Sequence, residues 1–191
     1  MSTAVVVDAV ARNRAEGRPG TEVTSIEPYP SDGLRRLAEA GEVTLVDRPA
    51  QEVAVEVASQ LEAGDVLFID STHTVRTGSE VVDLYLDVLP RLRAGVLVHI
   101  HDIYLPYLYS PLVLHELWDW QETVVLAALL SENPNFAVRC LTALLHTERP
   151  DDLRALLPEY RPARLDDGLA PGGEVDGHLP LSCWLERINP G

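Results

Sequence analysis

The fold is decided by residues 64–107, GDVLFIDSTHTVRTGSEVVDLYLDVLPRLRAGVLVHIHDIYLPY, in which two apolar segments flank an amphipathic one. Neither VLFI (66–69) nor VLVHI (96–100) shows the alternation of a half-buried strand. Continuous apolar strands are typical of a parallel sheet that helices cover on both faces. Between them, apolar residues recur at helical spacing from Gly78 to Arg93. This strand–helix–strand order predicts an α/β fold with a parallel sheet.

The same alternation extends in both directions along the chain. On the amino-terminal side we expect helices over 3–17, 31–41 and 49–64 and strands over 22–27 and 42–47. On the carboxyl-terminal side we expect a helix over 114–130, a strand or short helix over 135–145 and a final edge strand over 179–188. The chain is therefore expected to be a single domain over 1–191. Within it, 103–120 is predicted to be an aromatic lid or substrate-pocket segment, and 147–178 an irregular surface stretch.

The composition limits the classes of partner. The formal net charge is −15, and all fifteen basic residues are arginine. Nucleic acids and anionic membranes require basic surfaces, so we expect neither as a partner. The amino terminus lacks the basic region of a secretory signal and no apolar stretch is long enough to span a bilayer, which predicts a cytoplasmic protein. Of the partner classes considered, a small molecule is the one we expect. The composition does not decide whether the chain forms a homo-oligomer.

Acidic residues follow the predicted strands where the strands end. Glu27, Asp70 and Asp102 each come directly after an apolar run, and histidines accompany two of them as His73 and His101. In an open parallel sheet, ligands bind outside the carboxyl ends of the strands. We therefore expect these side chains to surround one small ligand.

The segments IEPYP (26–30) and 64–107, together with the closing strand LPLSCWLERI (179–188), resemble a class I S-adenosylmethionine-dependent methyltransferase. Within that family, the chain is similar to a bacterial small-molecule methyltransferase branch. The resemblance covers nearly the whole chain. It implies a Rossmann-like, doubly wound, mostly parallel sheet of seven strands with a reversed carboxyl-terminal strand.

The resemblance also implies a cofactor, S-adenosylmethionine, and residues that would bind it. Glu27 would hold the ribose with Pro28 beside it, and Arg48 and Ala50 would lie near the adenine. Asp70 would lie at the methyl-transfer side together with His73. The acceptor would be an oxygen or nitrogen of a small molecule.

His73 and His101 are the candidate general bases, because imidazole titrates near neutrality. In metal-dependent relatives, similar to catechol O-methyltransferase, acids at the positions of Asp70 and Asp102 bind magnesium. Those relatives place an asparagine or aspartate directly after the second acid, where this chain has Ile103. A divalent metal at Asp70 and Asp102 is therefore a weaker expectation, and the nearby histidines would favour a softer metal than magnesium.

Aromatic residues of the lid segment could line the acceptor pocket, and Tyr104, Tyr107 and Trp118 are the candidates. An apolar cap over the sheet edge is an equally good reading of them. His99 is expected on the opposite face of its strand from His101, as a core histidine whose hydrogen bonds are satisfied.

One element of the resembling family is missing from this sequence. Its first strand and glycine-rich turn should precede the first helix, and the strand would lie centrally, between the strands 22–27 and 65–70. Without it, those two strands would each lack a partner. The sequence is therefore expected to be truncated at its amino terminus, with a strand donated by a second chain, or a closed-up sheet that has lost methyl transfer, as alternatives. Other functional hypotheses are a metal-assisted hydrolase using the Asp/His cluster and a non-catalytic methyltransferase-like partner protein.

Overall fold

The computed structural model describes residues 2–108, 119–162 and 177–188. Where the sequence predicts a single domain over 1–191, contacts group the residues into two compact units, Met1–Ala54 and Val55–Gly191. We call them the amino-terminal and carboxyl-terminal units, and each is described by itself.

The amino-terminal unit holds a two-stranded parallel sheet. It contains α1 (Ser2–Ala15), β1 (Thr24–Ile26), α2 (Asp32–Glu39), β2 (Thr44–Val46) and the start of α3 (Ala50–Ala58). Thr24 pairs with Thr44 and Ile26 with Val46. Helix α2 begins where predicted, because the hydroxyl of Ser31 accepts a hydrogen bond from Leu34 N at 3.3 Å. The predicted strand–helix–strand order of this unit is confirmed.

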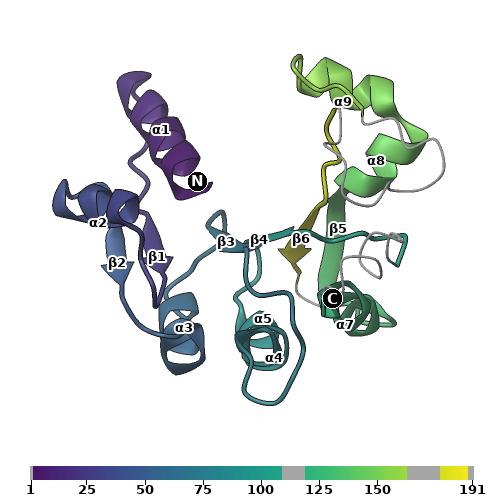
Figure 1. Cartoon of the computed structure of the whole chain (residues 1–191), viewed down its shortest axis with the longest axis horizontal. Helices are drawn as coiled ribbons and strands as arrows, with labels where there is room; N and C mark the ends of the chain where they lie inside the picture. Colours follow the sequence, from purple (N-terminus) through teal and green to yellow (C-terminus); the bar gives the residue numbers. More distant parts are fainter. Residues whose placement is uncertain (1, 109–118, 163–176, 189–191) are drawn as a thin grey trace. The chain divides into compact units, whose positions relative to one another are not determined.

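The carboxyl-terminal unit holds a four-stranded sheet in the order β3-β4-β6-β5 (Figure 1). Its elements are β3 (Val66–Ile69), α4 (Glu80–Asp83), η1 (Leu84–Val88), α5 (Leu89–Arg91), β4 (Leu97–His101), α7 (Glu122–Leu130), β5 (Phe136–Leu141), α8 (Thr142–Glu148), α9 (Pro150–Leu156) and β6 (Ser182–Arg187). Strand β4 is parallel to β3, and β6 is antiparallel to both β4 and β5. The α/β fold with a reversed carboxyl-terminal strand is thus confirmed. The prediction that β6 forms an edge is wrong, because it lies between β4 and β5.

The strands that flank the predicted gap each have one open edge. Within the described residues, β1 pairs only with β2 and β3 only with β4. The strands of the described residues therefore form two sheets, one in each unit. The missing strand between those at 22–27 and 65–70 stays a prediction.

The main core lies on one face of the four-stranded sheet. Val98, Ile100, Cys183 and Leu185 are fully buried there, on the side of α4, α5 and α7 (Figure 1). The opposite face is only partly covered, since Phe68 is 37% exposed and His99 and Trp184 are intermediate. In this unit the apolar strands are therefore buried on one face more completely than on the other.

The helix predicted over 78–93 forms, but with a π-helical segment, η1, between α4 and α5. Pro90 explains the interruption, because its ring would clash with the carbonyl of the residue four positions earlier in a regular helix. A wider turn immediately before the proline avoids that clash. Tyr85, within η1, is fully buried.

Two predicted segments differ in detail. Residues 150–156, inside the stretch predicted to be irregular, form α9, which begins at Pro150 and buries Leu153. Proline is favoured in the first turn of a helix, which accounts for this start. The segment 135–145 was predicted to be a strand or a short helix, and it contains both, because strand β5 leads directly into helix α8. The helix predicted from 114 is described only from Glu122, and residues 109–118 lie outside the described part.

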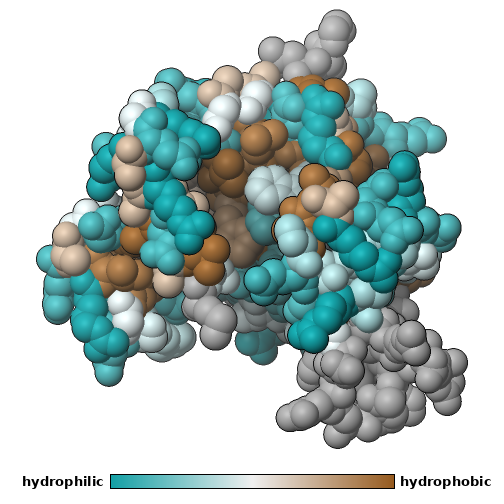
Figure 2. All heavy atoms as spheres, turned by 90° about the horizontal axis from the view of Figure 1, so that it is seen from above, coloured by the Kyte–Doolittle hydropathy of each residue, from teal (hydrophilic) through white to brown (hydrophobic). Residues whose placement is uncertain are grey.

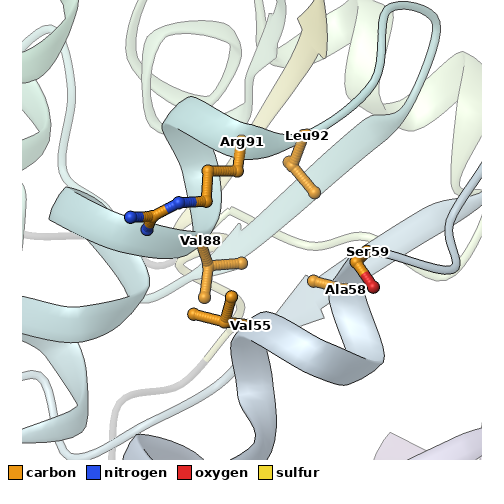
Figure 3. Close-up of a pocket in the computed structure, with 6 residues that line it drawn as sticks. All are labelled: Val55, Ala58, Ser59, Val88, Arg91 and Leu92. Carbon is orange, nitrogen blue, oxygen red and sulfur yellow. The ribbon is translucent and has the colours of Figure 1, made fainter.

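Hydrophilic residues make up much of the face drawn in Figure 2, in keeping with the net charge of −15. A small cavity of about 40 Å³ lies between the end of α3 and the η1–α5 segment (Figure 3). It is lined by Val55, Ala58, Ser59, Val88, Arg91 and Leu92, and it has room for little more than one water molecule. No helix among residues 2–108, 119–162 and 177–188 is long and apolar enough to cross a membrane.

Candidate functional site

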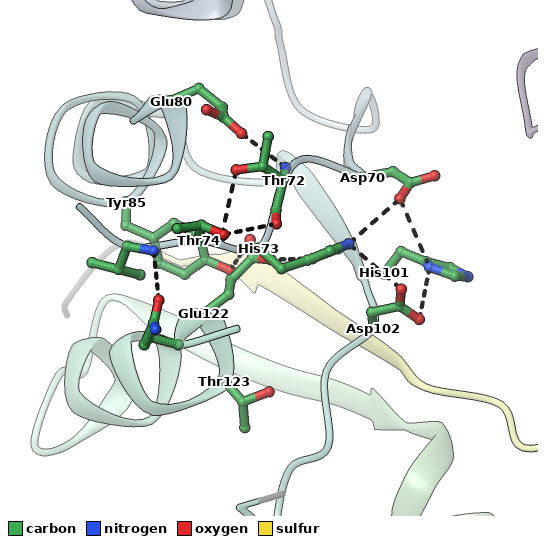
Figure 4. Close-up of polar contacts among 12 residues, drawn as sticks. Asp70, Thr72, His73, Thr74, Glu80, Tyr85, His101, Asp102, Glu122 and Thr123 are labelled. Atoms are coloured by element: carbon green, nitrogen blue, oxygen red, sulfur yellow. Dashed lines mark hydrogen bonds and ion pairs between the residues drawn. The ribbon is translucent and has the colours of Figure 1, made fainter. Parts of the chain in front are cut away.

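The ends of β3 and β4 bring four predicted side chains together (Figure 4). Asp70 follows β3 directly and His73 lies three residues on, while His101 ends β4 and Asp102 follows it. His73 Nε2 lies 3.5 Å from Asp102 Oδ2 and 4.0 Å from Asp70 Oδ1. His101 Nδ1 lies 3.9 Å from Asp70 Oδ1. Neighbouring parallel strands thus deliver both acid–histidine pairs to one edge.

Two of these residues have an unusual backbone conformation. His73 has φ 61° and Asp102 has φ 56°, in the left-handed region that residues with a Cβ seldom adopt. Such conformations cost of order 1 kcal/mol or more and persist only where surrounding contacts impose them. Asp and His are among the residues with a Cβ that adopt this region most often, and tertiary contacts add to that local preference.

Glu122, the first residue of α7, is the most important site residue that the sequence analysis missed. Its side chain is almost fully buried, and its Oε2 lies 2.6 Å from His73 Nδ1. The hydroxyl of Tyr85 donates a 2.8 Å hydrogen bond to the other oxygen, Oε1. A single acid at the start of an apolar helix is the one sequence signal that could have indicated it, because a buried carboxylate requires partners.

The first turn of α7 also holds the backbone of both loops. Gln121 N and Glu122 N donate to the carbonyl of His73, and the side chain of Gln121 accepts from Val75 N. The Trp120 ring lies 4.7 Å from the His73 ring. On the other loop, Tyr104 N donates to the buried hydroxyl of Thr123 at 3.2 Å. These contacts explain how strained turns at His73 and Asp102 are maintained.

The charges around His73 and His101 favour their protonated forms. Burial lowers the pKa of His73, but the hydrogen bond and charge of Glu122, with the charges of Asp102 and Asp70, outweigh it and raise the pKa above 6.5. The contact with Asp102 raises the pKa of His101 more than burial lowers it, and the charges of Asp102 and Asp70 add to this rise. His101 Nδ1 is 3.1 Å from Asp102 Oδ1 without hydrogen-bond geometry, so the contact is an ion pair.

His99 contradicts one prediction. It lies on the same face of β4 as His101, not the opposite one, because residues two apart on a strand point the same way. Its Nε2 lies 2.9 Å from Ser182 Oγ, and its ring stacks on Trp184 at 4.2 Å. Burial, the nearby charge of His101 and only a small opposing effect of Asp70 set its pKa to about 4. The expectation of a satisfied histidine is met, although on the half-exposed face.

The remaining predicted cofactor residues belong to the amino-terminal unit. Glu27 follows β1 and is partly buried, and its Oε1 accepts a hydrogen bond from Tyr29 N at 2.9 Å, with Pro28 between them. Arg48 follows β2 and forms a 2.9 Å ion pair with Glu52 of α3. Ala50 is the first residue of α3. Because Asp70 lies in the other unit, these residues form one group and the Asp/His cluster another.

The predicted substrate-pocket residues differ in exposure. Tyr104 is buried, whereas Tyr107 is 39% exposed and its hydroxyl lies 3.2 Å from Glu148 Oε1 on α8. Trp118 lies outside the described residues. Their role in an acceptor pocket stays a prediction.

Comparison with protein families adds a decisive observation. A family model described as a methyltransferase domain matches residues 1–103, more than half of the chain. The chain belongs to the class I S-adenosylmethionine-dependent methyltransferase family. The matched residues include Asp70, His73, His101 and Asp102, and Glu122 lies beyond them. A search of curated proteins gives no match.

The sequence predicted, as a weaker expectation, a divalent metal at Asp70 and Asp102. In the part of the chain that the structure describes, no group of three or more His, Cys, Asp or Glu side chains has the arrangement of a metal centre. The position after Asp102 is the buried, apolar Ile103. The side chains contact one another as ion pairs instead, and the donor set does not fit a metal.

Proposed function

We propose that this methyltransferase uses S-adenosylmethionine to methylate an oxygen or nitrogen of a small molecule, with His73 accepting the proton of the acceptor. The observation that carries the proposal is the convergence of Asp70, His73, His101 and Asp102 at the carboxyl ends of β3 and β4. Family membership supplies the reaction class, and the cluster supplies a base of suitable chemistry.

The residues fit the chemistry of the cofactor and acceptor. Glu27 offers a partly buried carboxylate at the end of a parallel strand, the usual acceptor for ribose hydroxyls. Within the described residues, Ser71 Oγ and His101 Nδ1 are buried polar atoms without a hydrogen-bond partner. Buried polar atoms usually find partners, so Ser71 Oγ is suited to bind a ligand, whereas His101 Nδ1 already forms an ion pair with Asp102.

In the proposed reaction, S-adenosylmethionine supplies a methyl group on a sulfonium, and the methyl departs to the acceptor while sulfur keeps the electrons of the broken C–S bond. His73 Nε2 takes the acceptor's proton as the new bond forms. Asp102 and Asp70, 3.5 Å and 4.0 Å from Nε2, then stabilise the imidazolium. His101 is the second candidate base, since its side chain is 44% exposed.

Binding and transfer test the proposal separately. Isothermal titration with S-adenosylhomocysteine should show one site per chain, and Glu27→Ala should abolish it. Glu22→Ala, two residues before the same strand, removes an exposed carboxylate and should bind like the unaltered protein. Methyl transfer from labelled S-adenosylmethionine to a panel of small alcohols, phenols and amines should then depend on His73, with His73→Gln losing at least about 100-fold. Absence of binding by the unaltered protein would favour the non-catalytic alternative.

A further inference from the structure

We propose that Glu122 is a positioning residue that places the proton of neutral His73 on Nδ1 and directs Nε2 toward Asp70 and Asp102. The proposal rests on the proposed function only in so far as Nε2 is the atom that receives the acceptor's proton. It adds a residue 49 positions from His73 in the sequence and outside the family match.

The hydrogen-bond pattern of the Glu122 carboxylate fixes the direction of each bond. Tyr85 donates its hydroxyl proton to Oε1, and His73 Nδ1 lies 2.6 Å from Oε2. An ionised carboxylate can only accept, and the Nδ1 contact with Glu122 is shorter than the contacts of Nε2 with Asp102 at 3.5 Å and Asp70 at 4.0 Å, so a neutral His73 carries its proton on Nδ1. The lone pair of the ring is then on Nε2, the nitrogen that faces Asp102 and Asp70.

The surrounding backbone and the burial of Tyr85 hold this arrangement. The π-helical segment η1 carries Tyr85 into the core, where it is fully buried against Glu122. The backbone N–H groups of Gln121 and Glu122 bind the carbonyl of His73, which keeps that residue in its left-handed conformation. Glu122 therefore fixes both the ring and the backbone of His73. Figure 4 shows the ring between Glu122 on one side and the two aspartates on the other.

The position of the His73 ring argues against a purely structural role for the His73–Glu122 pair. A buried carboxylate–imidazole pair that only stabilised the core would be satisfied at Nδ1, with Nε2 free to lie anywhere. Here Nε2 lies at the edge of the sheet beside Asp70, which is 40% exposed, and Asp102, which is 24% exposed. The ring thus connects the buried Glu122 with the carboxylates nearest to solvent. This is the geometry of a base whose ring is oriented by a buried carboxylate at Nδ1, while Nε2 is directed toward the edge of the sheet.

Glu122→Gln tests the proposal, because glutamine keeps the shape of glutamate but its amide can donate to Nδ1. The readout is the ¹⁵N NMR signature of the His73 ring, assigned with His73→Gln and recorded at a pH where the ring is neutral. We expect the Nδ1–H form in the unaltered protein, and an Nε2–H form or a mixture in Glu122→Gln. Methyl-transfer kcat should fall about 100-fold or more in this variant, with KM changed less than about threefold.

Two other variants make the test specific. Tyr85→Phe should keep the Nδ1–H form and reduce kcat by less than about tenfold. Glu186→Gln changes a carboxylate that pairs with Arg139 on the far strands and should leave the His73 signature and kcat unchanged.

The outcomes separate this proposal from the proposed function. An Nδ1–H signature that persists in folded Glu122→Gln would overturn the positioning role, whatever the activity. An Nε2–H signature in the unaltered protein would do so even if Glu122→Gln failed to fold. A shifted signature in a protein that methylates no acceptor would support the positioning role and count against methyl transfer by His73.

Discussion

His73 and His99 are shifted in opposite directions because different groups face their rings. Three carboxylates, Glu122, Asp102 and Asp70, surround His73, and together they outweigh burial and raise its pKa. His99 is desolvated by burial between the rings of Phe68 and Trp184, and the nearby charge of His101 adds to this effect, so its pKa falls to about 4. The imidazole that the proposed reaction uses is therefore the one that binds its proton more tightly.

The raised pKa of His73 predicts the pH dependence of methyl transfer. A base must be unprotonated to accept a proton, so kcat/KM should be low where His73 is charged and should rise with pH. Because the pKa is raised, the midpoint of the rise should lie above 6.5. A pH profile measured with an acceptor that does not titrate between about pH 5 and 9 checks this. A flat profile, or a midpoint below 6.5, would be incompatible with His73 as the base.

The candidate site was only partly predictable at the level of residues. Asp70, His73, His101 and Asp102 could be grouped from sequence, because strand ends in a parallel sheet meet at one edge. Glu122 could not be grouped with them from sequence, since it begins a helix in a distant part of the chain and resembles an ordinary first-turn acid. Its burial against Tyr85 is a property of packing, because Pro90 accounts for the π-helical segment but does not indicate what the Tyr85 side chain contacts.

Among the elements, the turns that precede β3 and β4 are joined by a hydrogen bond. They differ in how closely other atoms approach the glycine of each turn. Gly64 N donates to Gly95 O at 2.9 Å, and both glycines have positive φ, 94° and 86°. A Cβ on Gly95 would lie 2.6 Å from Ala63 Cβ and 3.1 Å from its Cα, whereas a Cβ on Gly64 would meet nothing within 4 Å. Alanine at position 64 would therefore introduce backbone strain alone, whereas alanine at position 95 would introduce backbone strain and steric overlap.

Gly95→Ala should destabilise the protein more than Gly64→Ala. Both variants incur the strain of a positive φ, about 1–2 kcal/mol. Gly95→Ala adds the overlap with Ala63, which we expect to cost roughly a further 1–3 kcal/mol. Free energies of unfolding from urea denaturation, compared between the two variants, measure the difference. Equal losses would mean that the turn before β4 relaxes away from Ala63.

Element types were predicted better than their lateral order. Helical spacing, proline starts and strand-ending acids identify most helices and strands of both units. The place of β6 between β4 and β5 depends on pairing across the sheet, which the sequence of a single strand does not specify. By contrast, the shared face of His99 and His101 follows from the strand period alone, so it was predictable and the expectation of opposite faces was wrong.

At the scale of the whole molecule, buried apolar side chains are unevenly divided between the two units. Of those in the described residues, the amino-terminal unit contributes Val10, Val43, Val53 and Ala54. The carboxyl-terminal unit contributes the larger set, with fully buried side chains on β4, β6, η1 and α7. A two-stranded sheet with little buried surface is marginally stable by itself. In the part of the chain that the structure describes, β1 and β3 also each have one edge without a strand partner.

This uneven division predicts different rates of amide hydrogen exchange in the two units. Local opening is easiest where few apolar contacts must break, so β1 and β2 should exchange faster than β4 and β6. We expect a difference of at least about tenfold after correction for the intrinsic rates of the unfolded chain, which corresponds to roughly 1.4 kcal/mol of opening free energy. Exchange followed by mass spectrometry on peptides covering 24–46, 97–101 and 182–187 measures it. Equal protection in all three would show that the amino-terminal unit opens only with the rest of the chain, and that its few buried side chains understate its stability.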